Sequence, residues 1–176
     1  MAYELGPCQI LYHLLTVSGT ALTDLGKTLG GVELEITETS QQLKTDQDGE
    51  VPVDERITGT TPKITARLAD ITLANLAFML KQSVQTDGAK QKVVVTPNTG
   101  TSLMTAGAKI VIKPYEAGVP TTNANKWITI PKAGITATGK LTYDNTTQRV
   151  IEFVATGYPS GDADNSVLII GDETVV

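Results

Sequence analysis

Alternation of aliphatic and polar residues predicts that most of this chain forms β-strands. The clearest case is residues 32–39, where valine, leucine and isoleucine alternate with glutamate and threonine. A period of two is typical of a strand with one buried face and one face toward solvent. Similar alternation, or a short apolar run, predicts strands at residues 10–17, 53–57, 63–68, 92–95, 108–113, 126–130, 134–143, 149–156 and 167–170.

One segment has a helical period instead. Four apolar residues recur at the spacing i, i+3, i+4 and i+7, namely Leu73, Leu76, Ala77 and Leu80. This spacing predicts a short amphipathic helix. Asp70 or Thr72 can cap its first turn, and Lys81 suits its C-terminal end.

The segments between the strands indicate one domain that covers residues 1–176. Residues 40–52 read as a long polar loop that contains the turn pair Asp48-Gly49, and residues 1–7 read as an N-terminal arm. Many short strands with turn residues between them favour a sandwich or barrel. We therefore predict a mainly β fold on the α+β border, a β-sandwich or partial barrel with one flanking helix.

Composition argues against nucleic-acid readout and against an aromatic binding platform. The chain of 176 residues carries 14 basic and 19 acidic residues, a formal net charge of −5, with no cluster of Lys and Arg. A protein that grips duplex DNA normally carries a basic patch. Aromatic residues make up only 5% of the chain. No basic leader or bilayer-length apolar run is present, so we expect a protein that folds in a cytoplasm and does not insert into a membrane.

Residues suited to catalysis or metal binding are few. His13 is the only histidine and Cys8 the only cysteine, and they are only five residues apart in the chain. A nucleophile needs a base and an orienting group, and a zinc site needs more ligands than these. Residues 44–55 resemble a calcium loop at four positions, but Lys44 stands where the first carboxylate is required. We expect no enzyme, no metal and no cofactor.

The order of elements in the first 80 residues resembles a known family. The similarity rests on GKTLGGVELEI at residues 26–36, KTDQDG at 44–49, PVD at 52–54, Gly59, and the pattern DxTLxNL at 70–76, preceded by GPC at 6–8. In these segments the chain resembles the major tail tube proteins of long-tailed bacteriophages, which are related to type VI secretion tube proteins. Beyond residue 80 the similarity lies only in the type of architecture.

This resemblance implies a β-sandwich with a flanking helix, six copies of which form a ring. Rings stack into a hollow tube, and strands of every subunit join into a barrel around the lumen. Genomic DNA passes through the lumen at infection without sequence-specific binding. Further partners would be tape-measure, terminator and baseplate or tip proteins, and the protein would reside in the virion tail after assembly in the host cytoplasm.

Two groups of residues become candidates under this interpretation. Glu33, Glu35 and Thr37 would face the lumen, although the same residues suit the solvated face of an ordinary sandwich. The long loop would reach a neighbouring ring or subunit, with Lys44, Asp46, Asp48 and Glu50 as contact residues. The termini, residues 1–7 and 171–176, are weaker candidates for such contacts.

The alternative is a carbohydrate- or receptor-binding β-sandwich module of a phage baseplate or fibre. Such a module usually presents an aromatic surface, and Trp127 is the only tryptophan of the chain. Alternation places it on the same strand face as Thr129, where it could be exposed, although a core or interface position suits it better.

Overall fold

A computed structural model describes residues 6–138 and 148–175 of the chain. The elements are, in order, β1 (Cys8–Leu14), β2 (Thr23–Asp24), β3 (Thr28–Leu43), β4 (Asp54–Leu68), α1 (Leu73–Met79), β5 (Val84–Asp87), β6 (Lys90–Val93), β7 (Ala108–Glu116), β8 (Val119–Pro120), the 3-10 helix η1 (Ala124–Lys126), β9 (Ile128–Thr138), β10 (Ile151–Gly157) and β11 (Ile169–Ile170). The predicted mainly β fold with one flanking helix is confirmed.

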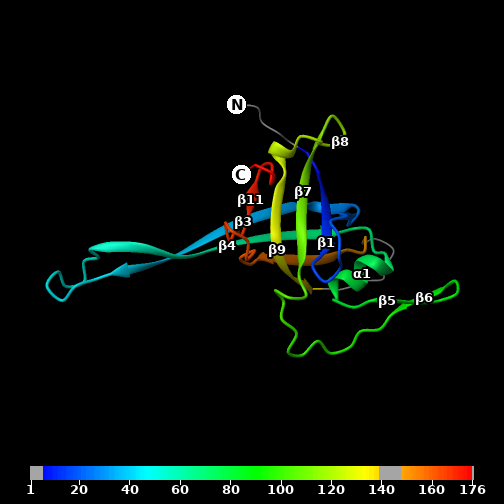
Figure 1. The fold of residues 1–176 in the computed structure, drawn as a ribbon, viewed down its shortest axis with the longest axis horizontal. Coiled ribbons are helices and arrows are strands. Elements are labelled where there is room, and N and C mark those ends of the chain that lie inside the picture. The colour runs from blue at the N-terminus through cyan, green and yellow to red at the C-terminus, as the bar shows by residue number, and fades with distance from the viewer. Residues whose placement is uncertain (1–5, 139–147, 176) are drawn as a thin grey trace.

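The strands form two crossed layers that share one hydrogen-bonded order, β2-β1-β7-β9-β10-β4-β3. Figure 1 shows β1, β7 and β9 running across the direction of β3 and β4. β9 joins the layers, because Ile128–Ile130 pair with β7 and the residues from Ala133 to Thr138 pair with β10. A strand that changes layers is typical of orthogonal sandwiches. β2 and β3 lie at opposite ends of the order, so the described strands do not close into a barrel.

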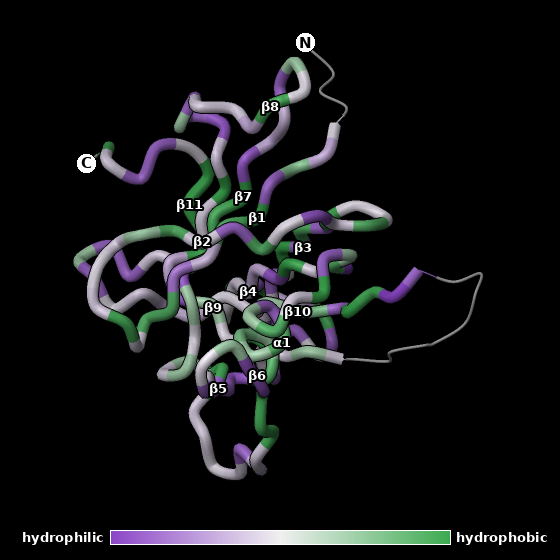
Figure 2. The backbone as a smooth tube through the Cα atoms, turned by 90° about the vertical axis from the view of Figure 1, so that its right-hand side faces the viewer, coloured by the Kyte–Doolittle hydropathy of each residue, from purple (hydrophilic) through white to green (hydrophobic). Residues whose placement is uncertain are grey.

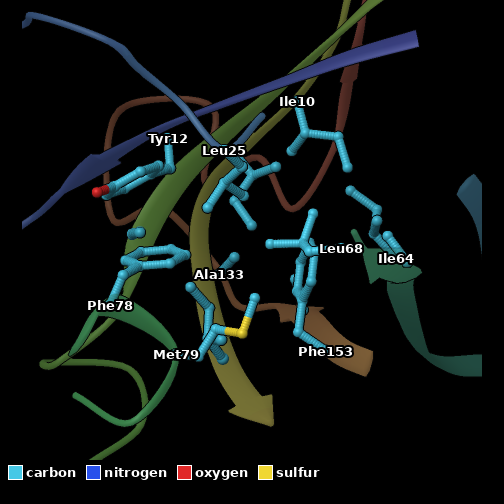
Figure 3. Close-up of a cluster of buried hydrophobic side chains, with 14 of the residues drawn as sticks. Ile10, Tyr12, Leu25, Ile64, Leu68, Phe78, Met79, Ala133 and Phe153 are labelled. Carbon is cyan, nitrogen blue, oxygen red and sulfur yellow. The ribbon is translucent and has the colours of Figure 1, made fainter. Parts of the chain in front are cut away.

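The core lies between these layers and is closed on one side by α1 (Figure 3). Ile10, Leu25 and Phe153 are completely buried. Tyr12 stacks on Phe78, with ring centroids 3.8 Å apart. Burial of each large apolar side chain contributes about 1.5–3 kcal/mol, so this cluster dominates the stability of the sandwich.

Helix α1 begins as predicted, and its inward face includes Leu76 and Ala77 of the predicted stripe but extends to residues outside the stripe. The Thr72 hydroxyl accepts a hydrogen bond from the Asn75 amide, which confirms the predicted cap. Phe78 and Met79 are buried, whereas Leu73, a member of the predicted stripe, is 38% exposed. The Asn75 side chain donates to the Leu25 carbonyl at 2.9 Å, a contact 50 residues away in sequence that no local period contains.

Several predicted boundaries were wrong. Residues 40–43, predicted as loop, belong to β3, and the two strands predicted at 53–57 and 63–68 are one strand, β4. The strands predicted at 126–130 and 134–143 are likewise joined in β9, although residues 139–143 lie outside the described part. In each case the backbone pairing continues where side-chain alternation stops, because both faces of the segment are exposed or a glycine or proline interrupts the pattern.

We predict that Phe153→Ala lowers the free energy of unfolding by about 3–5 kcal/mol, because it leaves a cavity in the core. The matched change Ile57→Ala, at a side chain that is 65% exposed, should cost less than about 0.5 kcal/mol. Urea unfolding followed by circular dichroism measures both values. Equal losses would contradict the assignment of Phe153 to the core and of Ile57 to a segment outside it.

Candidate assembly surface

Strands β3 and β4 form a hairpin that extends beyond the sandwich. They pair from Thr28 and Leu68 at the base to Leu43 and Asp54 near the tip. β10 pairs with β4 only over residues 63–68, so residues 54–62 and their β3 partners have no strand on the β10 side. At about 3.3 Å per residue the free part is roughly 30 Å long. Figure 1 shows it at one end of the long axis of the molecule.

Polar cross-strand contacts hold the free part of this hairpin together. The register shifts between Thr39 and Ser40 of β3. At this bulge the Thr58 hydroxyl donates to the Thr39 carbonyl at 3.1 Å. Nearer the tip, the Ser40 hydroxyl donates to the Glu55 carboxylate at 2.5 Å. These cross-strand hydrogen bonds stabilise the strand pair although neither of its faces is buried. Because no face is buried, the sequence lacks the alternation of apolar and polar residues that predicts a strand.

The four predicted loop residues, Lys44, Asp46, Asp48 and Glu50, all lie exposed at the tip of this hairpin. The connection between the strands is residues 44–53, later than the predicted 40–52. The Asp48 carboxylate accepts a hydrogen bond from the Thr45 hydroxyl, and Gly49 has a φ of 65°, which completes the predicted turn. The structure therefore brings the loop candidates together, at the point of the chain farthest from the core along the hairpin.

The free part of the hairpin also exposes large apolar side chains. These are Ile36 (48%), Leu43 (37%), Val51 (66%), Val53 (52%) and Ile57 (65%). The prediction that the apolar face of residues 32–39 packs into the sandwich holds for Val32 and Leu34, which pack against the core, and is wrong for Ile36. Ile36 lies opposite Pro62, where β10 ends. Exposed aliphatic side chains gathered on one projection mark a contact surface.

The three predicted lumen residues share one face of β3. Glu33, Glu35 and Thr37 lie directly opposite Thr65, Lys63 and Thr61 of β4. With Arg67 of β4 and Glu152 of β10 these residues form what we call the polar face. Lys63, Thr65 and Arg67 alternate along β4, so the sequence pattern alone favours one face for all three. Glu152 could not be added from the sequence, because it lies 85 residues from Arg67.

Both cations of the polar face have carboxylate partners. Arg67 donates to Glu152 at 3.0 Å, and the Lys63 amine lies 4.0 Å from the Glu35 carboxylate. These side chains are 40–61% exposed, so each pair stabilises the fold by little. These ion pairs determine the charge of the polar face instead. The face has three carboxylates and two cations, and both cations are already paired with a carboxylate.

Strand β3 is also an open edge of the sheet. It stands last in the strand order and pairs only with β4, so a strand of 16 residues presents its other side without a partner among the described residues. Long unpaired edges invite pairing with another chain. Gly30 and Gly31, both with positive φ, accompany a register shift near the base of this edge.

The only described histidine and cysteine both lie in β1 and are partly buried. His13 is half-buried in β1, and its Nδ1 lies 3.0 Å from the Ala21 carbonyl oxygen. Burial raises the pKa of the Cys8 thiol, which reduces its reactivity. Within residues 6–138 and 148–175, no three His, Cys, Asp or Glu side chains gather in a group that could hold a metal ion. No helix of that part of the chain is long and apolar enough to cross a bilayer.

Trp127 anchors a turn instead of presenting a flat aromatic surface. Its indole N–H donates to the Thr121 carbonyl at 3.1 Å. The Lys113 amine lies over the ring, 3.7 Å from the centroid. Glu116 accepts hydrogen bonds from Lys126 and Thr121, which lower its pKa. The ring is thus half-buried and covered by a cation, so Trp127 itself does not present a flat aromatic surface.

The described terminal residues lie against the body of the sandwich. The Pro7 carbonyl accepts a hydrogen bond from the Tyr115 amide at 3.0 Å. The Glu173 carboxylate pairs with Lys109 of β7 at 2.6 Å. Residues 1–5 and 176, which belong to the predicted terminal contacts, lie outside the described residues.

No protein-family model matches this chain, and no curated protein matches its sequence. Among solved structures, one that matches is a chain of the anti-feeding prophage baseplate, determined by cryo-EM with six-fold symmetry. The match covers 89% of this chain and 90% of that chain, at 10% identity and a TM-score of 0.42. At this score the likeness carries no argument about family or function.

Proposed function

We propose that this chain is the non-enzymatic structural subunit of a phage tail tube. Six copies form a ring, rings stack into a hollow tube, and the tube conducts the genome during infection. The observation that carries the proposal is the β3–β4 hairpin, which projects roughly 30 Å beyond its last contact with β10 and exposes five large aliphatic side chains. A projection of this kind adds nothing to the core of its own subunit. Its physical purpose is contact with another chain.

The polar face supports the second part of the proposal, a lumen that lets DNA slide. A wall that grips phosphates needs unmatched Lys or Arg side chains, because the release of counterions drives such binding. On this face Arg67 and Lys63 are matched by Glu152 and Glu35, and Glu33 adds a further negative charge. The lining would therefore repel the phosphate backbone weakly and hold no base.

The edge of β3 supports ring closure. Pairing of this edge with a neighbouring subunit would satisfy its free backbone groups, and a closed ring leaves no edge exposed. The proposal includes contacts with tape-measure, terminator and baseplate or tip proteins at the ends of the tube. It places the protein in the virion tail after assembly in the host cytoplasm.

We predict that the purified protein forms rings or tubes, and that deletion of residues 42–50 prevents stacking without unfolding the sandwich. The deletion leaves five residues between Gln41 and Arg56, which face each other across the hairpin. Five residues are enough for a hairpin loop. Negative-stain microscopy over a range of salt and protein concentrations measures assembly, and the urea midpoint checks the fold.

The urea midpoint of the deletion variant should equal that of the wild type, because none of the deleted residues is buried in the core. Tubes of normal length from the deletion variant would show that the hairpin tip is not a stacking contact. A wild-type protein that remains monomeric under all conditions would contradict the proposed function itself.

We further predict that duplex DNA binds the polar face only after its charge is reversed. In the background lacking residues 42–50, where the face stays open, Glu33→Lys with Glu35→Lys should bind DNA at low salt. The affinity should fall steeply with added salt. Fluorescence anisotropy with a labelled duplex measures both, and Glu33→Gln with Glu35→Gln tests whether loss of negative charge suffices.

A control with the same net charge carries Asp162→Lys and Asp164→Lys, two exposed residues that are not part of the polar face. It should not bind DNA. Tight binding by the unsubstituted face at physiological salt would contradict its assignment as a lining that lets DNA slide.

A further inference from the structure

We propose that the tip of the β3–β4 hairpin docks on the β5–β6 hairpin of a second copy of this chain, acidic surface against basic surface around exposed valines. The inference rests on the proposed function and names the surface that receives the hairpin. Four features carry it: opposite charge, matching apolar patches, the marginal stability of β5–β6 alone, and the positions of the two hairpins.

The tip is acidic. Residues 44–56 contain five carboxylates and two cations, and one of these cations, Arg56, is already paired with Asp54 at 3.5 Å. Asp46 and Glu50 are exposed, and neither belongs to an ion pair of the described residues. Val51 and Val53, which follow them, are 66% and 52% exposed.

The β5–β6 hairpin has the opposite character. Residues 81–95 contain three lysines and one carboxylate, Asp87. Lys90 and Lys92 are exposed and alternate along β6, so they share one face, and neither forms an ion pair within the described part of the chain. Asp87 lies opposite Lys90 on that face and reduces its charge without cancelling it. Directly after β6, Val94 and Val95 are 40% and 64% exposed.

β5 and β6 form a separate two-stranded sheet. Figure 2 shows them below α1 and clear of β1, β3 and β7. An isolated hairpin of two strands is marginal in water, so this one gains stability from a partner. Its base is nevertheless fixed, because Asn98 donates to the Leu80 carbonyl and accepts from the Gln82 side chain, both at 3.0 Å. The surface is thus held in place while its outer face stays open.

The two hairpins project from opposite ends of the long axis in Figure 1. The tip of one molecule therefore cannot contact the β5–β6 hairpin of the same molecule. Complementary surfaces at opposite ends produce head-to-tail association, which generates closed rings or open stacks. Opposite charges fix the orientation and discourage contact of tip with tip.

Two charge-reversed variants test this contact. The first carries Asp46→Lys and Glu50→Lys, and the second carries Lys90→Glu and Lys92→Glu. In either variant alone the tip and the β5–β6 hairpin have like charge, so neither variant should form stacked tubes where the wild type does. When the two are mixed, each tip meets a hairpin of opposite charge, and the mixture should associate again. Sedimentation velocity measures this, and the Asp162→Lys, Asp164→Lys variant controls for net charge.

We expect at least a tenfold rise in the concentration needed for assembly by either variant alone, and recovery to within about threefold of the wild type on mixing, where a factor of ten corresponds to 1.4 kcal/mol. Tubes formed by either variant at the wild-type concentration, or a mixture that does not stack, would overturn the docking contact. If the wild type forms tubes and the charge-reversed variants form them equally well, only this contact is rejected. Charge-dependent association that never yields rings or tubes would reject only the proposed function.

Discussion

The short pairing between β4 and β10 determines which part of β4 belongs to the sandwich and which part belongs to the free hairpin. Six residue pairs, from Leu68 with Ile151 to Lys63 with Thr156, bind β4 into the sandwich. The next residue of β4 is Pro62, which has no N–H to donate and is fully buried. Gly157, at the end of β10, lies so close beneath the Pro62 ring that a Cβ there would come within 2.5 Å of it. The ladder stops at this point, and the rest of β4 continues with β3 alone.

That division joins the core to the proposed assembly surface. Ile64, Ala66 and Leu68 are buried in β4, on the same strand that runs on to Asp54 at the tip. The direction of the free hairpin is therefore set by the packing of the sandwich and does not depend on a flexible linker. On the other face of the same short stretch, Lys63 and Arg67 are held by carboxylates. One strand thus supplies the core, the polar face and the base of the projection.

The sequence predicted the parts of this structure that depend on local periods. Alternation identified β3 around residues 32–39, placed Glu33, Glu35 and Thr37 on one face, and indicated a mainly β sandwich. The Asp48-Gly49 turn and the Thr72 cap follow from local chemistry and were also predicted. Each of these signals depends on residues a few positions apart.

Features that depend on distant contacts could not be predicted in this way. The free hairpin has no buried face, so Ser40–Leu43 pair as a strand although their sequence lacks the alternation that would predict one. The inward face of α1 is chosen by Phe78 against Tyr12 and by Asn75 against the Leu25 carbonyl, from segments 50 or more residues away. Pro62 marks the end of the β10 ladder, but the sequence alone cannot predict this, because it depends on the contact between Pro62 and the distant Gly157.

In the proposed tube, the β3–β4 hairpin connects subunits while the polar face lines a channel. A cryo-EM reconstruction of the assembled wild-type protein tests it most directly. We expect stacked six-membered rings, with each hairpin tip in contact with another copy and Glu33, Glu35 and Thr37 facing the lumen. A reconstruction in which the hairpin points freely into solvent, or in which the polar face lies on the outside of the tube, would contradict this arrangement.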